Sequence, residues 1–167
     1  MRLLLAILML SASVTAQSVR EAPANAPSTG QLAPRSEPGD RLSVNGVVVD
    51  AAGAPVAGAS LYIYQTDREG YYGVKPASDS NNPRLKLMLR SDAKGAWSFD
   101  TIKPGSYPGS RNPAHIHFEV SASGRANRIF EIVFEGDPFL TERMKSDPSF
   151  SIRRVDNGRV TERIVLR

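Results

Sequence analysis

The chain has 167 residues, a formal net charge of +4 at pH 7 and no cysteine. This length favours one domain, and the mild, mixed charge without a basic stripe of interleaved aromatics argues against a nucleic-acid partner. Because disulfides are excluded, stability must come from the core, a metal or self-association.

The first 16 residues have the pattern of an export signal. Met1-Arg2 is a short positive start, residues 3–10 form an apolar run, and Val14-Thr15-Ala16 is a small-residue cleavage site. The apolar run is too short to span a bilayer. We therefore expect cleavage after Ala16 and an exported, periplasmic or extracellular protein without a membrane span.

Residues 17–40 are rich in proline, alanine and serine, and they differ in composition from everything that follows. Such a segment buries too little apolar surface to offset its ordering entropy, which predicts a disordered linker. The alternative is a short arm that packs on the domain or on a partner. The folded domain is expected over residues 41–167.

Short runs of apolar and β-branched residues, separated by Gly/Pro turns, continue through that domain. Many short strands at close spacing predict an all-β sandwich or barrel. Only residues 139–145 have a helical pattern, and Asp156-Asn157-Gly158 predicts the turn of a last hairpin. Strands are expected at residues 42–50, 59–65, 85–89, 97–99, 115–120, 128–134, 151–155 and 160–166.

The chain contains two histidines, His115 and His117, and both lie in one predicted strand. Residues i and i+2 of a strand share a face, so the two imidazoles can bind one metal ion. The alternative is a polar strand face, or a cross-strand pair, without a metal. Tyr107 in a Gly/Pro turn just upstream and Tyr72 after Gly70 favour the metal.

Five stretches stand in order along the domain: Gly46–Asp50 with Gly53–Ala59, Tyr64–Asp67 with Gly70–Tyr72, Thr101–Pro108, Pro113–Phe118, and Phe134–Pro138. The first stretch alone is typical of transthyretin-like modules, which are mostly binding domains. Together, the five resemble the intradiol ring-cleavage dioxygenases, the family of protocatechuate 3,4-dioxygenase and catechol 1,2-dioxygenase. The resemblance implies an all-β, antiparallel β-sandwich of the prealbumin type with few short helices.

The resemblance also implies a metal site, a non-haem Fe(III) bound by Tyr72, Tyr107, His115 and His117. Tyr71 is the near neighbour that would point the other way in an extended segment. Two tyrosines with two histidines argue against zinc, which prefers Cys, His and carboxylate ligands. The implied reaction is O2-dependent cleavage of a small aromatic diol between its hydroxyl-bearing carbons, as in aromatic compound catabolism. In it Tyr107 takes up a proton, and no organic cofactor is needed.

Two positions depart from the family pattern. Asn112 stands where the family usually has Arg, and Glu131 where it usually has Gln, so that positive charge beside the bound ring is lost. Arg111 could replace the missing cation, or it could be a solvated surface residue. Glu131 could instead face the core edge or accept a hydrogen bond from an extra substrate hydroxyl.

Three interpretations therefore remain open. They are a secreted iron dioxygenase, a metal-binding relative with altered catalysis, and a sandwich binding module in which the four residues do not converge. Exposed strand edges in a sandwich without disulfides also lead us to expect a homo-oligomer.

Overall fold

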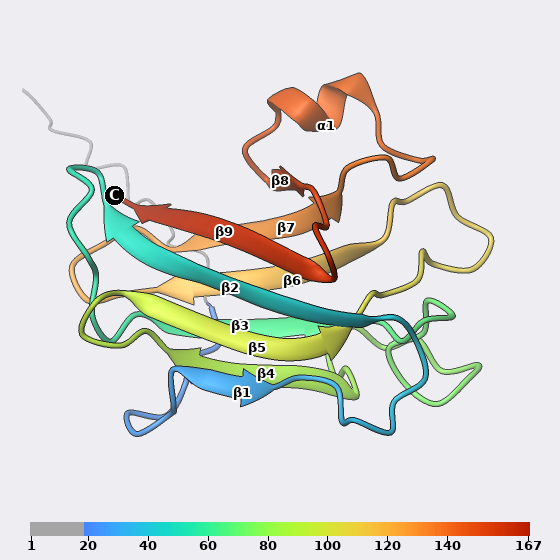
Figure 1. The fold of residues 1–167 in the computed structure, drawn as a ribbon, viewed down its shortest axis with the longest axis horizontal. Helices are drawn as coiled ribbons and strands as arrows, with labels where there is room; N and C mark the ends of the chain where they lie inside the picture. The colour runs from blue at the N-terminus through green and yellow to red at the C-terminus, as the bar shows by residue number, and fades with distance from the viewer. Residues whose placement is uncertain (1–18) are drawn as a thin grey trace, which may run out of the picture.

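The computed structural model describes residues 19–167, and the expected export signal lies outside them. The described chain folds into two facing β-sheets and one short helix, α1 (Glu142–Ser146) (Figure 1). The predicted β-sandwich is thus confirmed. No helix among the described residues is long and apolar enough to cross a membrane.

The first sheet has the strand order β1-β5-β2-β9. Its strand β2 pairs antiparallel with β5 and parallel with β9, and β1 pairs parallel with β5. Buried and less buried residues alternate along β9, because successive side chains point to opposite faces. The bounds are β1 (Thr29–Gln31), β2 (Arg41–Asp50), β5 (Ala96–Ile102) and β9 (Arg159–Leu166).

The second sheet has the order β4-β3-β6-β7-β8. Its first four strands pair antiparallel, and β7 pairs parallel with β8. Both sheets are therefore mixed: four strand pairs are antiparallel, as expected, and the three pairs β1–β5, β2–β9 and β7–β8 are parallel. The bounds are β3 (Ser60–Gln65), β4 (Leu85–Arg90), β6 (His115–Ser121), β7 (Arg128–Phe134) and β8 (Phe150–Arg153).

The core lies between the sheets and is dominated by aromatic and branched side chains. The Phe118 ring stacks on Phe130 at 5.0 Å and lies 5.5 Å from the Trp97 ring. Gly46 on β2 allows this packing, since a Cβ there would lie 2.6 Å from the Trp97 ring and would collide with the Glu162 carbonyl oxygen. A side chain at position 46 would therefore push the first sheet apart.

The predicted last hairpin is wrong, although its turn is present. Asp156 and Arg159 exchange two backbone hydrogen bonds of 2.9 Å around Asn157 and Gly158, which both have positive φ. However, β8 belongs to the second sheet and β9 to the first. The turn residues determine only the local reversal, and β9 joins β2 because that pairing buries its alternate apolar residues in the core.

The linker prediction for residues 17–40 is also wrong over its described part, residues 19–40, which we call the N-terminal arm. Within it, β1 extends the first sheet, and Leu32 and Ala33 are buried. Arg20 forms a 2.6 Å ion pair with Glu119, and Arg90 donates to the Ala22 carbonyl at 2.7 Å. The arm is poor in apolar residues, but its backbone groups find partners on strands that already exist.

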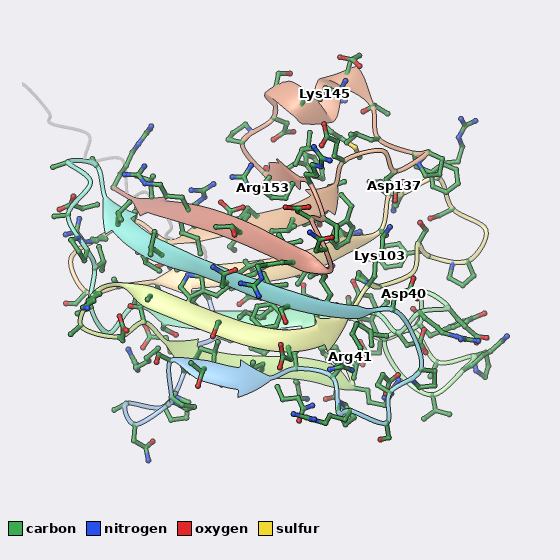
Figure 2. The ribbon with its side chains drawn as sticks, in the orientation of Figure 1. Asp40, Arg41, Lys103, Asp137, Lys145 and Arg153 are labelled. Carbon is green, nitrogen blue, oxygen red and sulfur yellow. The ribbon has the colours of Figure 1, made fainter. Side chains whose placement is uncertain are left out.

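Two long connections lie together at one end of the sandwich, beyond the ends of β3, β5 and β6 (Figure 1). We call them loop 66–84 and loop 103–114. Thr66 donates to the Gly105 carbonyl at 2.9 Å, and the Gly105 N–H donates to the Asp67 carbonyl at 2.8 Å. These bonds bring a tyrosine of each loop to the same place. Asp40, Lys103 and Asp137 lie at this end (Figure 2).

Candidate metal centre

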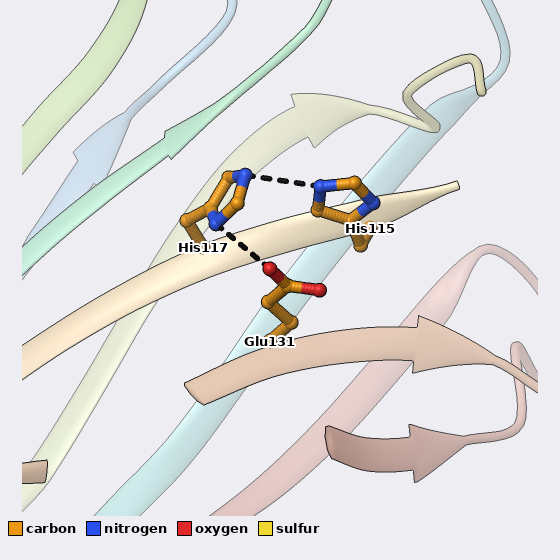
Figure 3. A group of neighbouring side chains, drawn as sticks. All are labelled: His115, His117 and Glu131. Carbon is orange, nitrogen blue, oxygen red and sulfur yellow. Dashed lines mark hydrogen bonds and ion pairs between the residues drawn. The ribbon is translucent and has the colours of Figure 1, made fainter. Parts of the chain in front are cut away.

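His115 and His117 lie on β6, a strand paired on both sides, with β3 and with β7. Their neighbours Ile116 and Phe118 enter the core, so the imidazoles project from the outer face of the second sheet. The two Nε2 atoms face each other at 3.0 Å (Figure 3). The predicted shared face of the two histidines is confirmed.

Tyr72 from loop 66–84 and Tyr107 from loop 103–114 complete a cluster of four donor atoms. The Tyr72 Oη lies 2.6 Å from the His117 Nε2. The Tyr107 Oη lies 2.9 Å from the His115 Nε2 and 3.3 Å from the His117 Nε2, and it contacts the Tyr72 Oη. Ligand atoms about 2.1 Å from one metal ion lie roughly 3 Å apart. The spacing of this four-atom cluster therefore fits one ion.

The turn before Tyr72 determines which of two adjacent tyrosines enters the cluster. The Asp67 carboxylate accepts hydrogen bonds from the backbone N–H groups of Glu69 and Tyr71, and Gly70 has a φ of +88°. Tyr72 is consequently turned inward and is only 4% exposed. Tyr71 instead lies beside Lys75, with the ammonium 5.7 Å from its ring centre.

Both imidazoles present a lone pair to the cluster. The Nδ1 of His115 lies 2.7 Å from the Pro113 carbonyl oxygen, which can only accept, so this nitrogen carries the proton. The Nδ1 of His117 lies 3.3 Å from Glu131 Oε1. Burial and the nearby His115 lower the pKa of His117 to about 3, which keeps its ring neutral. Two nitrogen lone pairs that face each other repel, and a proton donor or a cation between them removes this repulsion.

The two tyrosine hydroxyls supply that proton when no metal is bound. Burial raises the pKa of Tyr72 and of Tyr107 above that of free tyrosine, so neither ionises near neutral pH by itself. A bound metal ion is the largest local charge and can displace a phenol proton. The donor set of two phenols and two neutral imidazoles therefore suits a strongly charged cation such as Fe(III).

The remaining predicted site residues divide into two groups. Glu131 on β7 is half-buried opposite His117, and His115, His117 and Glu131 each offer a ligand atom within 4.8 Å of the others. Arg111 and Asn112 are exposed on loop 103–114. Among residues 19–167, no hydrogen bond or ion pair joins either of these side chains to the cluster.

Tyr64 is a contact that the sequence analysis missed. Its ring stacks on His117 with the centroids 4.3 Å apart and 10° between the planes, and it also lies 5.9 Å from the Tyr72 ring. Burial raises the pKa of Tyr64 to about 12, so the ring stays neutral. The available signal was the cross-strand register, since Tyr64 and His117 are directly opposed on β3 and β6.

One of the hollows of the surface lies away from the four-atom cluster. A cavity of about 710 Å³ is formed over the first sheet, among whose lining residues are Asn45, Ser98 and Thr161, and it shares no residue with the four-atom cluster. The cluster instead opens to solvent through the partly exposed side chains of Tyr107 and Glu131. We take the four-atom cluster, and not this cavity, as the candidate site, because the two phenol oxygens and two imidazole nitrogens that can bind a metal meet there.

Known proteins match the chain over most of its length. The sequence profile of a family described as Dioxygenase matches residues 16–159. Chlorocatechol 1,2-dioxygenase of Rhodococcus opacus is 28% identical over 72% of this chain and 55% of its own length. The protocatechuate 3,4-dioxygenase beta chain of Burkholderia cepacia is 33% identical over 61% of this chain and 48% of its own length. The chain thus spans about half the length of these curated relatives.

Solved structures show the same fold. The 3-chlorocatechol 1,2-dioxygenase of Rhodococcus opacus 1CP aligns with a TM-score of 0.66 and 22% identity over 90% of this chain and 70% of its own. The dioxygenase domain of a dioxygenase–carbohydrate-binding fusion from Streptomyces sp. SirexAA-E aligns with a TM-score of 0.63 and 27% identity. That alignment covers 89% of this chain and 96% of the domain.

Proposed function

Because the chain belongs to the intradiol ring-cleavage dioxygenase family, we propose that it is an iron enzyme that cleaves a small aromatic diol between its two hydroxyl-bearing carbons. One observation carries the proposal. Four donor atoms from two loops and one strand, on Tyr72, Tyr107, His115 and His117, meet at spacings that fit one ion. A sandwich without metal chemistry has no need to gather two phenols and two neutral imidazoles.

These four side chains would hold a non-haem Fe(III), which supplies a Lewis acid that makes a bound diol reactive toward O2. The rest of the proposal concerns the chain's own residues. Tyr72 is almost fully buried, whereas Tyr107 is partly exposed at the mouth of the cluster. A diol entering from solvent therefore meets Tyr107 first.

Tyr107 is the residue we assign to proton transfer. Tyr107 would be a phenolate while it helps to hold Fe(III), and as a phenolate its Oη can take a proton from a substrate hydroxyl. Its side chain is partly exposed and so can be reached from solvent. The raised pKa of Tyr107 means that its phenol, once away from the metal, holds that proton. In the net reaction both atoms of O2 enter the product, a ring-opened diacid, so no further oxidant or reductant is required.

The test is the iron content and visible absorption of the purified protein, followed by O2 uptake with catechol. Bound iron with a tyrosinate-to-iron charge-transfer band, and O2 uptake that depends on catechol, are expected. A Tyr72→Phe variant should change the band, because it removes one phenolate donor. Protein loaded with Fe(III) that shows no such band would contradict the assigned ligands.

A metal-binding relative with altered catalysis is the second candidate, and position 112 favours it. The Asn112 side chain is exposed and uncharged, so it provides no cation for the negative charge that develops on the ring. If that charge limits the rate, Asn112→Arg should raise O2 uptake with catechol, while Asn82→Arg in the other loop should not. If wild-type protein and the Asn112→Arg variant both bind iron but do not take up O2 with catechol, the result would favour the relative with altered catalysis.

We also propose that the protein is exported, on the basis of the signal pattern in residues 1–16. Expression with its full N-terminus should give a mature chain that begins near Gln17 in the exported fraction. N-terminal sequencing that finds Met1 retained, or protein confined to the cytoplasm, would contradict export.

A further inference from the structure

We propose that Glu131 is a positioning residue that fixes the tautomer and orientation of His117 and strengthens its Nε2 as a metal donor. This inference rests on the proposed metal site and assigns a role to a carboxylate that the family pattern does not predict. Glu131 does not belong to the four-atom cluster. It acts on the opposite side of the His117 ring.

The Glu131 carboxylate lies at the ring nitrogen of His117 that does not face the four-atom cluster. Oε1 of Glu131 lies 3.3 Å from the Nδ1 of His117, whereas the Nε2 of the same ring faces His115 (Figure 3). The strand register sets this contact, because His117 on β6 is directly opposite Glu131 on β7. Directly opposed residues on one face of an antiparallel pair lie roughly 5 Å apart at Cβ, which is within reach of both side chains.

Two more contacts restrict the same ring. Tyr64, opposite His117 on the other neighbouring strand, covers one face of the imidazole, and the Tyr72 hydroxyl lies at its Nε2. The ring is therefore held at both nitrogens and on one face. A metal-bound histidine typically has such an acceptor behind it, and the acceptor determines the tautomer and raises the basicity of the ring.

The Nδ1 atoms of the two histidines contact different kinds of acceptor. The Nδ1 of His115 contacts the neutral Pro113 carbonyl at 2.7 Å, whereas the Nδ1 of His117 faces a carboxylate. A carboxylate draws the Nδ1 proton more strongly than a peptide carbonyl does. His117 is consequently the stronger electron donor of the pair.

A competing role for Glu131 is direct metal ligation together with His115 and His117, since each offers an atom within 4.8 Å of the others. Two histidines and one carboxylate are a known ligand set for non-haem Fe(II). The observed contact argues for positioning, because the carboxylate lies at Nδ1 and both phenols lie at Nε2. The two roles predict different results when Glu131 is replaced.

The first measurement uses metal-free protein and the ¹⁵N signals of its histidines. Wild type should show His117 protonated at Nδ1, and Glu131→Gln should retain this tautomer because the amide oxygen still accepts. Glu131→Leu removes the acceptor and should give a mixture of tautomers. Glu135→Gln is the matched control, since Glu135 is exposed just beyond the end of β7. A His117 tautomer that is unchanged in Glu131→Leu would overturn the proposal.

The second measurement uses Fe(III)-loaded protein. Glu131→Leu should weaken iron binding roughly 10–100-fold, the usual cost of losing such a partner, and Glu131→Gln, which keeps a neutral acceptor, should weaken it less. Glu131→Leu should also move the charge-transfer band to longer wavelength, because less electron density reaches the metal. Glu135→Gln should change neither. An unchanged affinity and band in Glu131→Leu would overturn the proposal, as would complete loss of iron, which indicates direct ligation.

Failure of the proposed function has a different signature. If wild-type protein binds no iron, the four-ligand assignment is wrong, but the tautomer measurement on metal-free protein still decides whether Glu131 positions His117. If wild type binds iron with the expected band while the Glu131 variants resemble it, the function stands and only the role of Glu131 is wrong.

Discussion

The histidines and the tyrosines of the cluster are held in two different ways. His115 and His117 lie in β6, whose backbone is hydrogen-bonded to strands on both sides, and the alternating side chains of Ile116 and Phe118 pack in the core. Tyr72 and Tyr107 lie on loops at the end of the sandwich, and hydrogen bonds at Gly105, from the Thr66 hydroxyl and to the Asp67 carbonyl, join these loops. One half of the site is fixed by sheet register and the other by turn geometry.

The difference indicates a division of labour. Groups on paired strands keep their positions at little further cost, which suits ligands that hold a metal throughout a reaction. Groups on loops can move by small changes in a few backbone torsions. The proton transfer that we propose for Tyr107 therefore suits the position of this residue on a loop.

The largest expected effect comes from the strand-borne half. His117→Ala should weaken iron binding by more than about a hundredfold, since loss of an outer partner alone typically costs 10–100-fold. Tyr107→Phe, on a loop, should retain more iron and shift the band. Iron titration of both variants measures the difference. Equal losses in the two would remove the distinction between a fixed half and an adjustable half.

The next effect tests the turn geometry of the loop-borne half. A Cβ at Gly70 would collide with the Ser106 carbonyl oxygen, and the φ of this residue is +88°. Gly70→Ala should therefore lower the free energy of unfolding by about 2–4 kcal/mol and disturb the meeting of Tyr72 with Tyr107.

Gly109→Ala is the matched control for that change. Gly109 has a similar φ of +71°, but nothing lies within 4 Å of its would-be Cβ. Only the backbone cost of about 1 kcal/mol is expected, with the iron band preserved. Chemical denaturation measures the loss of unfolding free energy in the two variants, and visible spectra measure the iron band. Equal losses in Gly70→Ala and Gly109→Ala would show that the contact of Gly70 with Ser106 is unimportant.

A smaller effect links the N-terminal arm to the loop-borne half through pH. Arg84 ends loop 66–84, donates its N–H to the Tyr72 carbonyl, and forms a 2.6 Å ion pair with Glu37 of the arm. The hydrogen bond from Arg84 lowers the pKa of Glu37 in the folded protein. The resulting stability is present above the unfolded-state pKa of about 4.3 and is lost as pH falls through the lower folded-state pKa.

Glu37→Gln should therefore destabilise the protein at pH 7 by less than about 1 kcal/mol, because the Arg84 side chain is 37% exposed and the ion pair is screened. The difference from wild type should shrink as the pH is lowered below the unfolded-state pKa of Glu37 and through its lower folded-state pKa. Denaturant titrations at several pH values test this, and a difference that is independent of pH would exclude the ion pair as its cause.

The last substitution, at Tyr71, is expected to have no effect on the metal site. Tyr71→Phe should leave iron binding and colour unchanged, because Tyr71 lies beside Lys75 and outside the four-atom cluster. Its absorption spectrum is compared with that of Tyr72→Phe. Bleaching by Tyr71→Phe, with Tyr72→Phe unchanged, would mean that the turn at Gly70 places the neighbouring tyrosine inside.

The same distinction explains what could be predicted from sequence. The period of two in β6 placed both histidines on one face, and β7 was expected with its observed bounds, residues 128–134. Tyr72 was chosen over Tyr71 by resemblance, and the structure agrees because Asp67 and Gly70 form the turn. Periodicity within one segment thus captured the strand-borne half of the cluster.

Contacts between segments were not predictable in the same way. The pairing of Glu131 and Tyr64 with His117 depends on the register of three strands, which no single segment encodes. For residues 17–40 a disordered linker was preferred over the alternative of a packed arm, because composition reports apolar burial, whereas much of the arm is held by hydrogen bonds and ion pairs to distant residues. Likewise, the turn at Asn157 does not reveal that β8 and β9 enter different sheets.

The arm also has a consequence for the order in which the chain acquires its structure. Arg20 is synthesised early, but its partner Glu119 follows 99 residues later, and β1 needs β5 as its template. The arm can therefore dock only after most of the sandwich has assembled, since contacts distant in sequence close late. Removing the Arg20–Glu119 contact should thus leave the folding rate nearly unchanged and speed unfolding. Contacts of the arm therefore form after the folding transition state and slow the unfolding of the folded protein.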